Sequence, residues 1–351
     1  PHRDRGAARL TGAAPLVCAA SGGPFLTDAD DAALLVTGAA GFIGSRFVAS
    51  CAARGIRGVS VDHPPHFAAR AEHRGIAFGE IVDRAALFDW LAARRPRLRG
   101  IVHLGACTDT TQLDGAWLAQ VNTAYSQRVW GFAAEAGVPL VYASSAATYG
   151  DGSAGFEDDE ARIPALRPLN PYAESKQRFD LFALAAERRG TAPPAWSGFK
   201  FFNVYGPGER HKGRMASMVL QAFDQIRAGG VVRLFRSHDP AVADGEQKRD
   251  FVSVDDVVAV LHFALARPLA RGIFNLGSGR ARSFLDLARA VFAALGAPER
   301  IEFVDMPEAL RARYQSFTEA PMHKLRAAGY GAPFRELEAG VADYVRSLLR
   351  G

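Results

Sequence analysis

The stretch LLVTGAAGFIGS, residues 34–45, decides the fold of this chain. Its apolar run ends at Thr37 and is followed by Gly38, Gly41 and Gly44, after which a helical pattern begins. Small residues at this spacing let the backbone approach a pyrophosphate, whose charge is met by amide groups and by the helix dipole. The stretch therefore predicts a dinucleotide-binding turn between a strand and a helix.

Outward from this turn, short apolar runs alternate with helix-length segments. We expect strands at 34–37, 58–62, 101–105, 139–145 and 198–204, and helices at 42–54, 84–95, 113–136 and 172–189. Repeated strand, helix, strand units are typical of a doubly wound parallel sheet, as in Rossmann folds. The predicted fold class is therefore α/β.

The alternation loosens in the C-terminal part of the chain. A helix at 214–228, a strand at 231–236 and a loop at 237–248 predict a smaller, mixed α/β lobe. We expect a dinucleotide-binding domain over residues 34–204 and a mainly substrate-binding lobe over 205–351. Some segments of this lobe should return to the first domain.

The composition excludes several classes of protein. Of the 351 residues, 48% are hydrophobic and 23% charged, which is ordinary for a globular protein. No apolar run reaches the roughly 18 residues of a membrane span, so we expect no membrane partner. The net charge is +5, but the arginines are scattered, so we expect an anionic small ligand rather than nucleic acid.

Cysteine usage and the N-terminal segment bear on localisation. Cys18, Cys51 and Cys107 are odd in number and widely spaced, which argues against a disulfide framework or a metal site and fits a reducing cytoplasm. Residues 1–33 show little periodicity. We expect a flexible extension there rather than an export signal, because the apolar part is short and interrupted by proline.

The second predicted strand ends at Asp62, eighteen residues after Gly44. An acidic side chain there can accept hydrogen bonds from the adenosine ribose and favours NAD over NADP, because it repels a 2′-phosphate. His66 and Arg70 follow and can offset this charge, so both cofactors stay open. A turn aspartate ahead of two prolines is the alternative interpretation of Asp62.

A serine and a tyrosine–lysine pair complete a specific pattern. The predicted strand 139–145 ends in Ser144 and Ser145, and the sequence YAESK places Tyr172 and Lys176 four residues apart. On a helix this spacing puts phenol and ammonium on one face. A positive neighbour can lower the pKa of a tyrosine, which would make Tyr172 a usable base near neutral pH.

These residues resemble the extended short-chain dehydrogenase/reductase family, whose members act on nucleotide sugars with a tightly held nicotinamide. Within it, the chain is similar to the ADP-glyceromanno-heptose 6-epimerases, which invert C6 of a heptose for the lipopolysaccharide core. The likeness covers residues 34–349. It is carried by FFNVYGPGERHKGRMAS (201–217), GEQKRDFVSVDDVV (245–258), GIFNLGSGRARSF (272–284) and RYQSFTEAPMHKLRAAGY (313–330).

The resemblance implies an isomerase with ADP-heptose as substrate, NADP or NAD as cofactor, no metal, and a homo-oligomer, a pentamer. The implied catalytic residues are Ser145, Tyr172, Lys176 and Lys212. The implied cofactor contacts are Gly38, Gly41, Phe42, Ile43, Gly44, Asp62, His63, Leu104, Gly105, Ala106, Cys107, Asn122, Tyr172, Lys176 and Val204. The implied substrate contacts are Asn203, Arg214, Gln221, Phe235, Arg236, Ser237, His238, Arg249 and Tyr314.

Lys212 is one of five lysines in a chain with thirty-seven arginines. The carbon to be inverted is a secondary alcohol centre without a neighbouring carbonyl, so we expect inversion through a transient ketone with hydride removed and returned by the nicotinamide. The two faces present the oxygen in two places, so two acid/base groups are needed. The resemblance assigns these roles to Tyr172 and Lys212. We expect burial, or cationic neighbours such as His211, Arg210 and Arg214, to lower the pKa of Lys212.

The chain departs from the family pattern at five positions. Leu104 replaces a carboxylate, His63 an asparagine and Gln221 a histidine, while Lys200 and Phe201 replace an arginine and a tyrosine. We expect catalysis to survive, with cofactor preference or substrate grip altered.

Two alternatives are another nucleotide-sugar 4-epimerase or 4,6-dehydratase, and a non-catalytic dinucleotide-binding sensor. A dehydratase typically carries an acidic pair just after the serine strand, and AATYG at 146–150 has none. Retention of Ser145, Tyr172, Lys176 and Lys212 argues against the sensor.

Overall fold

The computed structural model describes residues 32–267, 271–311 and 314–350, so the expected N-terminal extension lies outside the described residues apart from its last two. A seven-stranded, wholly parallel sheet forms the larger lobe, in the order β10-β6-β5-β4-β1-β2-β3. Its strands are β1 (Ala33–Thr37), β2 (Gly58–Asp62), β3 (Glu80–Asp83), β4 (Leu98–His103), β5 (Leu140–Ser145), β6 (Trp196–Phe201) and β10 (Gly272–Leu276). The predicted doubly wound sheet is confirmed.

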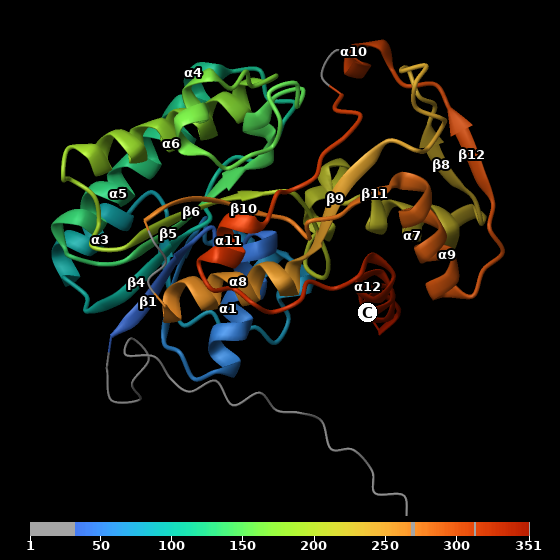
Figure 1. Ribbon diagram of the computed structural model, residues 1–351. Coiled ribbons are helices and arrows are strands. Elements are labelled where there is room, and N and C mark those ends of the chain that lie inside the picture. Colours follow the sequence, from blue (N-terminus) through green and yellow to red (C-terminus); the bar gives the residue numbers. More distant parts are fainter. Residues whose placement is uncertain (1–31, 268–270, 312–313, 351) are drawn as a thin grey trace, which may run out of the picture.

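Helices cover both faces of this sheet (Figure 1). One face packs against α1 (Phe42–Ala53), α8 (Val254–Ala266) and α11 (His323–Ala327), and the other against α3 (Leu87–Arg94), α5 (Tyr125–Glu135) and α6 (Pro171–Arg188). Because both faces are covered, inner strands such as β1 and β6 are buried along nearly their whole length rather than at alternate residues, whereas the edge strand β3 is partly exposed. The short α2 (Pro65–Ala69) follows β2, and α4 (Gly115–Leu118) leads into α5.

The smaller lobe holds a mixed three-stranded sheet and a parallel strand pair. The sheet has the order β11 (Ala281–Ser283), β9 (Lys248–Ser253), β7 (Asn203–Tyr205), and the pair joins β8 (Val232–Phe235) to β12 (Ile301–Val304). They pack with α7 (Met218–Gly229), α9 (Phe284–Leu295) and α12 (Leu337–Arg350) around a separate apolar core, and α10 (Glu308–Arg311) lies beyond β12.

The structure divides two elements that the sequence predicted as continuous. The run at 198–204 is broken at Phe202, whose amide donates to the Leu276 carbonyl at 3.1 Å, so β6 stays in the large sheet while β7 joins the small one. The helix expected at 113–136 contains a wide π-helical stretch, Ala119–Ala124. Both features depend on partners distant in sequence, which periodicity does not report.

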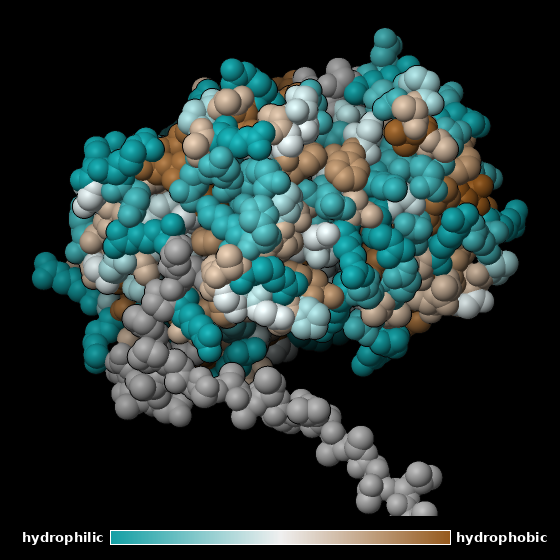
Figure 2. Space-filling model, viewed as in Figure 1, coloured by the Kyte–Doolittle hydropathy of each residue, from teal (hydrophilic) through white to brown (hydrophobic). Residues whose placement is uncertain are grey.

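The surface of the molecule differs from its apolar cores in hydropathy. The face shown in Figure 2 is mostly hydrophilic, with hydrophobic side chains gathered in small patches. None of the helices in the described part of the chain has the length and apolar character needed to cross a membrane.

Candidate active site

A cleft of about 1500 Å³ opens at the carboxyl ends of the parallel strands and reaches into the small lobe. Its walls include Gly38 after β1, Asp62 at the end of β2, Leu104 after β4 and Ser145 at the end of β5. This is where doubly wound sheets bind ligands, because the loops leaving successive strands diverge there.

The glycine turn, Gly38 to Gly44, forms a cradle in which there is room for backbone atoms but not for a side chain on Gly38 or Gly44. Gly38 has φ +69°, and a Cβ on it would lie 2.6 Å from the Gly105 nitrogen. A Cβ on Gly44 would lie 2.0 Å from the Gly38 carbonyl oxygen. The first turn of α1 can therefore close onto the strand with its amides toward the cleft, which fits the pyrophosphate of a dinucleotide.

A carboxylate and a guanidinium meet at the adenosine end of this cradle. Asp62 accepts from the backbone amides of Ala40 at 3.1 Å and His63 at 2.7 Å, and His66 Nδ1 lies 3.3 Å from it. Arg70 donates to the Ala40 carbonyl oxygen and lines the cleft. The site thus offers an acceptor for ribose hydroxyls and a cation for a 2′-phosphate.

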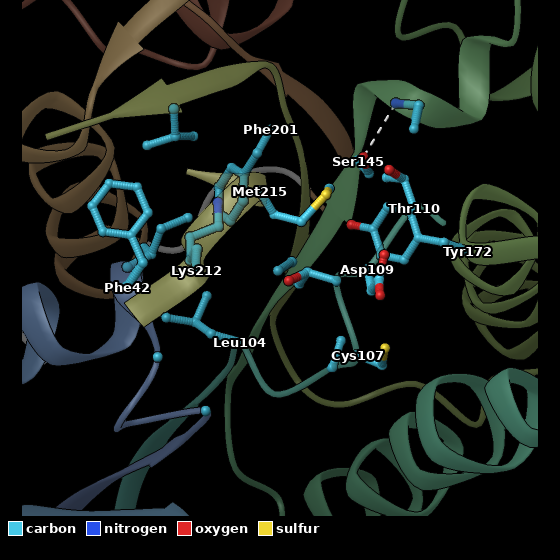
Figure 3. Close-up of a pocket in the computed structure, with 18 of the residues that line it drawn as sticks. Phe42, Leu104, Cys107, Asp109, Thr110, Ser145, Tyr172, Phe201, Lys212 and Met215 are labelled. Atoms are coloured by element: carbon cyan, nitrogen blue, oxygen red, sulfur yellow. Dashed lines mark hydrogen bonds between the residues drawn. The ribbon is translucent and has the colours of Figure 1, made fainter. Parts of the chain in front are cut away.

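Ser145 and Tyr172 lie together on one wall (Figure 3), and Lys176, one helical turn after Tyr172, also lines the cleft. Helix α6 starts at Pro171, and the Asn170 side chain accepts from the Ala173 amide at 2.9 Å, which places Tyr172 in the first turn. The Lys176 ammonium donates to the Ala143 carbonyl oxygen at 2.9 Å, so it is pinned to strand β5.

Burial governs the protonation of this wall. It raises the pKa of Tyr172, and a hydrogen bond with Ser145 opposes that rise. It lowers the pKa of Lys176 to about 8, with Asp180 acting in the opposite direction. The structure therefore differs from the expected net lowering of the tyrosine pKa, because desolvation of the phenolate outweighs the stabilising contacts.

Lys212 lies on the opposite wall of the cleft from Tyr172 (Figure 3). Its ammonium sits 5.4 Å from the centre of the Phe42 ring. Burial lowers its pKa, and Glu209 raises it by less. The cationic neighbours expected from the sequence do not lower this pKa. Arg210 pairs with Asp224 at 3.1 Å, His211 contacts Glu72, and Arg214 is exposed.

The loop that carries Lys212 is closed by a buried carboxylate. Glu209 is fully buried and accepts from the Ser217 amide and hydroxyl, each at 2.6 Å, and from the Gly206 amide at 3.3 Å. The Lys212 amide in turn donates to the Glu209 carbonyl at 2.9 Å.

A buried guanidinium lies behind the small-lobe end of the cleft. Arg249 is 7% exposed and lies 4.9 Å from the centre of the Tyr314 ring and 5.6 Å from that of Phe284, both of which line the cleft. In the described part of the chain it pairs with no carboxylate, and its guanidinium donates to the Lys248 carbonyl at 2.9 Å. A buried cation without a counter-charge suits an anionic ligand.

Most, but not all, of the expected site residues line the cleft. Those that do are Gly38, Gly41, Phe42, Ile43, Gly44, Asp62, Leu104, Gly105, Ala106, Cys107, Ser145, Tyr172, Lys176, Asn203, Val204, Lys212, Gln221, Phe235 and Tyr314. Those outside the lining are His63, Asn122, Arg214, Arg236, Ser237, His238 and Arg249.

The structure explains why four of these expected residues lie outside the lining of the cleft. Asn122 is 2% exposed and exchanges two hydrogen bonds with the Cys107 backbone, at 2.8 and 3.0 Å, so it supports a cleft residue from behind. His63 and Arg214 are exposed. Arg236 points to Asp244, with 3.0 Å between nitrogen and oxygen.

The cleft also contains residues that the sequence analysis missed. Asp109, Thr110 and Met215 lie between the two catalytic walls (Figure 3). Polar residues in the loop that follows β4, TDTT at 108–111, were a usable signal for the first two. Met215 had none, because its place depends on how the Lys212 loop folds.

The chain belongs to the NAD dependent epimerase/dehydratase family, which it matches over residues 34–277. It is an enzyme, and the expectation of a nicotinamide cofactor is confirmed. The glycine cradle fits this group, with Gly38, Gly44 and Asp62 placed to hold it.

Its curated relatives narrow the class. The ADP-L-glycero-D-manno-heptose-6-epimerase of Fusobacterium nucleatum is 42% identical over 327 residues, covering 90% of this chain and 98% of the relative. That of Nitratidesulfovibrio vulgaris is 45% identical, covering 90% and 97%. The solved Helicobacter pylori ADP-L-glycero-D-manno-heptose-6-epimerase has a TM-score of 0.73 at 25% identity, covering 91% and 96%. The expected resemblance is confirmed.

A broader relationship joins the chain to other nucleotide-sugar enzymes. The Thermus thermophilus UDP-glucose 4-epimerase complex with NAD has a TM-score of 0.71 at 26% identity, and covers 89% of this chain and 98% of that one. The shared architecture is therefore that of the nicotinamide-dependent epimerases.

Proposed function

We propose that the protein is an ADP-glyceromanno-heptose 6-epimerase that inverts C6 of ADP-D-glycero-D-manno-heptose through a transient ketone. The carrying observation is that Tyr172 and Lys212 face the cleft from opposite walls (Figure 3). Inversion requires a proton acceptor on each side of the reacting carbon, whereas a one-sided oxidation requires one. The relatives named above support the same substrate.

A nicotinamide held by the glycine cradle would supply the removal and return of a hydride. Ser145 and Tyr172 hold the sugar oxygen on one wall and exchange its proton. Lys176, anchored on the Ala143 carbonyl, is available for the cofactor ribose. Lys212 exchanges the proton when the oxygen points to the other wall, and its lowered pKa leaves more free amine near neutral pH.

The substrate's diphosphate suits the small-lobe end of the cleft. Arg249 is a buried cation between the Tyr314 and Phe284 rings, and its planar fork can grip two phosphate oxygens. Gln221 lines the cleft at the position where the family carries a histidine, and its amide nitrogen donates to the Ala216 carbonyl at 2.8 Å, which fixes the side chain there.

We further propose a cytoplasmic enzyme of lipopolysaccharide core synthesis, assembled as a homo-oligomer, a pentamer. The division into a cofactor domain over 34–204 and a substrate lobe over 205–351 belongs to the same proposal. Family resemblance supports these statements.

The decisive experiment incubates the purified protein with ADP-D-glycero-D-manno-heptose and follows C6 by NMR. We expect conversion to the L-glycero epimer without added oxidant or reductant. Absence of inversion by protein that retains its nicotinamide would defeat the proposal. Parallel incubation with UDP-glucose tests the 4-epimerase alternative, for which we expect no conversion.

A further inference from the structure

The loop that carries Lys212 is not held by regular structure. It runs through a short 3₁₀ stretch, Arg210–Met215, that is interrupted at Gly213 with φ 54° and ψ −122°. Glu209 closes the ends of the loop by its bonds to Gly206 and Ser217. The Lys212 amide donates to the Glu209 carbonyl within the loop, and a further anchor next to Lys212 comes from outside it.

Glu72 supplies that anchor from a segment 139 residues earlier. One of its carboxylate oxygens accepts both the backbone amide of His211, at 3.0 Å, and the ring Nδ1, at 2.8 Å. The Glu72 and His211 side chains are 18% and 15% exposed, so the contact is largely shielded from water. Bonds to an ionised acceptor in such a setting are strong and directional.

The protonation of the pair agrees with this geometry. Burial lowers the pKa of His211. The pKa of Glu72 is also lowered, against the effect of burial, by a hydrogen bond from its own backbone amide and by those from His211. A neutral imidazole with its proton on Nδ1 and an ionised carboxylate satisfy both hydrogen bonds. The residue adjacent to the base is therefore fixed in backbone and in side chain.

The anchoring segment itself is tied to the cofactor cradle. Glu72 lies in the 3₁₀ turn Ala71–His73, and Arg70, two residues earlier, donates to the carbonyl of Ala40 in the glycine turn. One short segment thus contacts both the turn that would hold the pyrophosphate and the loop that carries Lys212.

We propose that Glu72 is a positioning residue, which acts through His211 to hold Lys212 toward the cleft. This inference rests on the proposed function, in which Lys212 serves one of the two half-reactions. Loss of the anchor should slow the half-reaction that uses Lys212 and spare the one that uses Tyr172. A misplacement of about 1 Å at a reacting group can cost about 100-fold in rate.

The test compares Glu72→Ala, Glu72→Gln and Arg74→Ala in the holoenzyme. Glutamine keeps an oxygen that can accept both His211 bonds, and Arg74 is an exposed residue of the same segment. Single turnovers are started from each C6 epimer separately and followed by nicotinamide absorbance. Hydrogen exchange of residues 206–217 is measured by mass spectrometry.

In Glu72→Ala we expect oxidation of one epimer to fall about 10- to 100-fold while oxidation of the other stays within about twofold. Exchange of the 206–217 amides should rise. Glu72→Gln should restore both readouts to near wild type, Arg74→Ala should change neither, and Lys212→Met should reproduce the epimer asymmetry.

Several outcomes would overturn the inference. In Glu72→Ala these are an equal slowing of oxidation from both epimers, a loss of bound nicotinamide, or unchanged hydrogen exchange of the 206–217 amides. Failure of the wild-type protein to invert C6 would instead remove the proposed function, so the two failures are distinguishable.

Discussion

At the scale of single residues, the identity of Lys212 follows from its chemistry. An arginine at this position would have no free base to offer, because its pKa lies above about 12. A lysine can lose its proton when burial lowers its pKa, and burial is the main influence on Lys212. In an arginine-rich chain, this lysine is best explained by proton transfer.

Replacement of either proposed base should stop catalysis. We expect Lys212→Met and Tyr172→Phe each to lower kcat by about 10²- to 10⁴-fold, because each removes one general acid/base group. Bound nicotinamide, measured by absorbance after denaturation, should be retained. Lys248→Met, which alters an exposed lysine, is the matched control and should behave as wild type. Normal epimerisation by Lys212→Met would rule out the two-base mechanism.

Arg249 should affect binding more than chemistry. We expect Arg249→Gln to raise KM about 10- to 100-fold with a smaller change in kcat, because a charged hydrogen-bond partner of the diphosphate is lost. Steady-state kinetics measure this split. Arg289→Gln is a control at an exposed arginine outside the cleft, which pairs with Glu299 at 3.1 Å. A kcat defect with unchanged KM would contradict the assignment.

At the scale of elements, a buried ion pair joins β5, β6 and α6 beneath the catalytic wall. The Lys200 ammonium lies 2.7 Å from an Asp180 carboxylate oxygen and 2.6 Å from Thr148 Oγ1, and both charged side chains are wholly buried. Ser144 and Tyr142 donate to the same carboxylate at 2.7 and 3.1 Å. The family arginine is thus replaced by a lysine that keeps the charge balanced.

Removing one partner should destabilise the protein strongly. We expect Lys200→Met to cost about 3–5 kcal/mol in unfolding free energy, because Asp180 is left as a buried, unpaired charge. The double variant Lys200→Met/Asp180→Leu should recover much of that loss. Denaturant unfolding of the two single variants and the double variant measures the coupling. A Lys200→Met protein as stable as wild type would contradict this account.

At the scale of the whole molecule, two buried histidines should make stability fall in acid. Burial lowers the pKa of His103 from 6.5 to about 3 and that of His262 to about 4. Between these values and 6.5 the unfolded chain binds more protons than the folded one, so stability is lost as pH falls. Each histidine contributes up to about 1.4 kcal/mol per pH unit within its window.

This dependence can be measured by urea unfolding between pH 7 and pH 4. His262→Gln should flatten the slope by about one proton, and His103→Gln should do so independently. His323→Gln, at an exposed histidine, is the control. An unchanged slope in both buried-site variants would show that other groups set the acid sensitivity.

Much of the fold was predictable from local patterns, and the exceptions have a common origin. The glycine turn, the strand ends at Asp62 and Ser145, and the helix that carries Tyr172 were all expected. Strands β3 (EIVD) and β10 (GIFNL) were missed because two or three apolar residues in so short a run do not distinguish a strand from a loop. The break at Phe202 was missed because the apolar run continues through it.

The sequence by itself determined the α/β class, the dinucleotide turn and the set of chemically able side chains, because these depend on spacing over a few residues and on side-chain identity. Only the tertiary structure decided which walls they occupy. It placed Lys212 opposite Tyr172, buried Arg249 behind Tyr314, and moved Asn122 out of the lining. Contacts such as Glu72 with His211 join segments 139 residues apart, and only packing of the whole chain creates them.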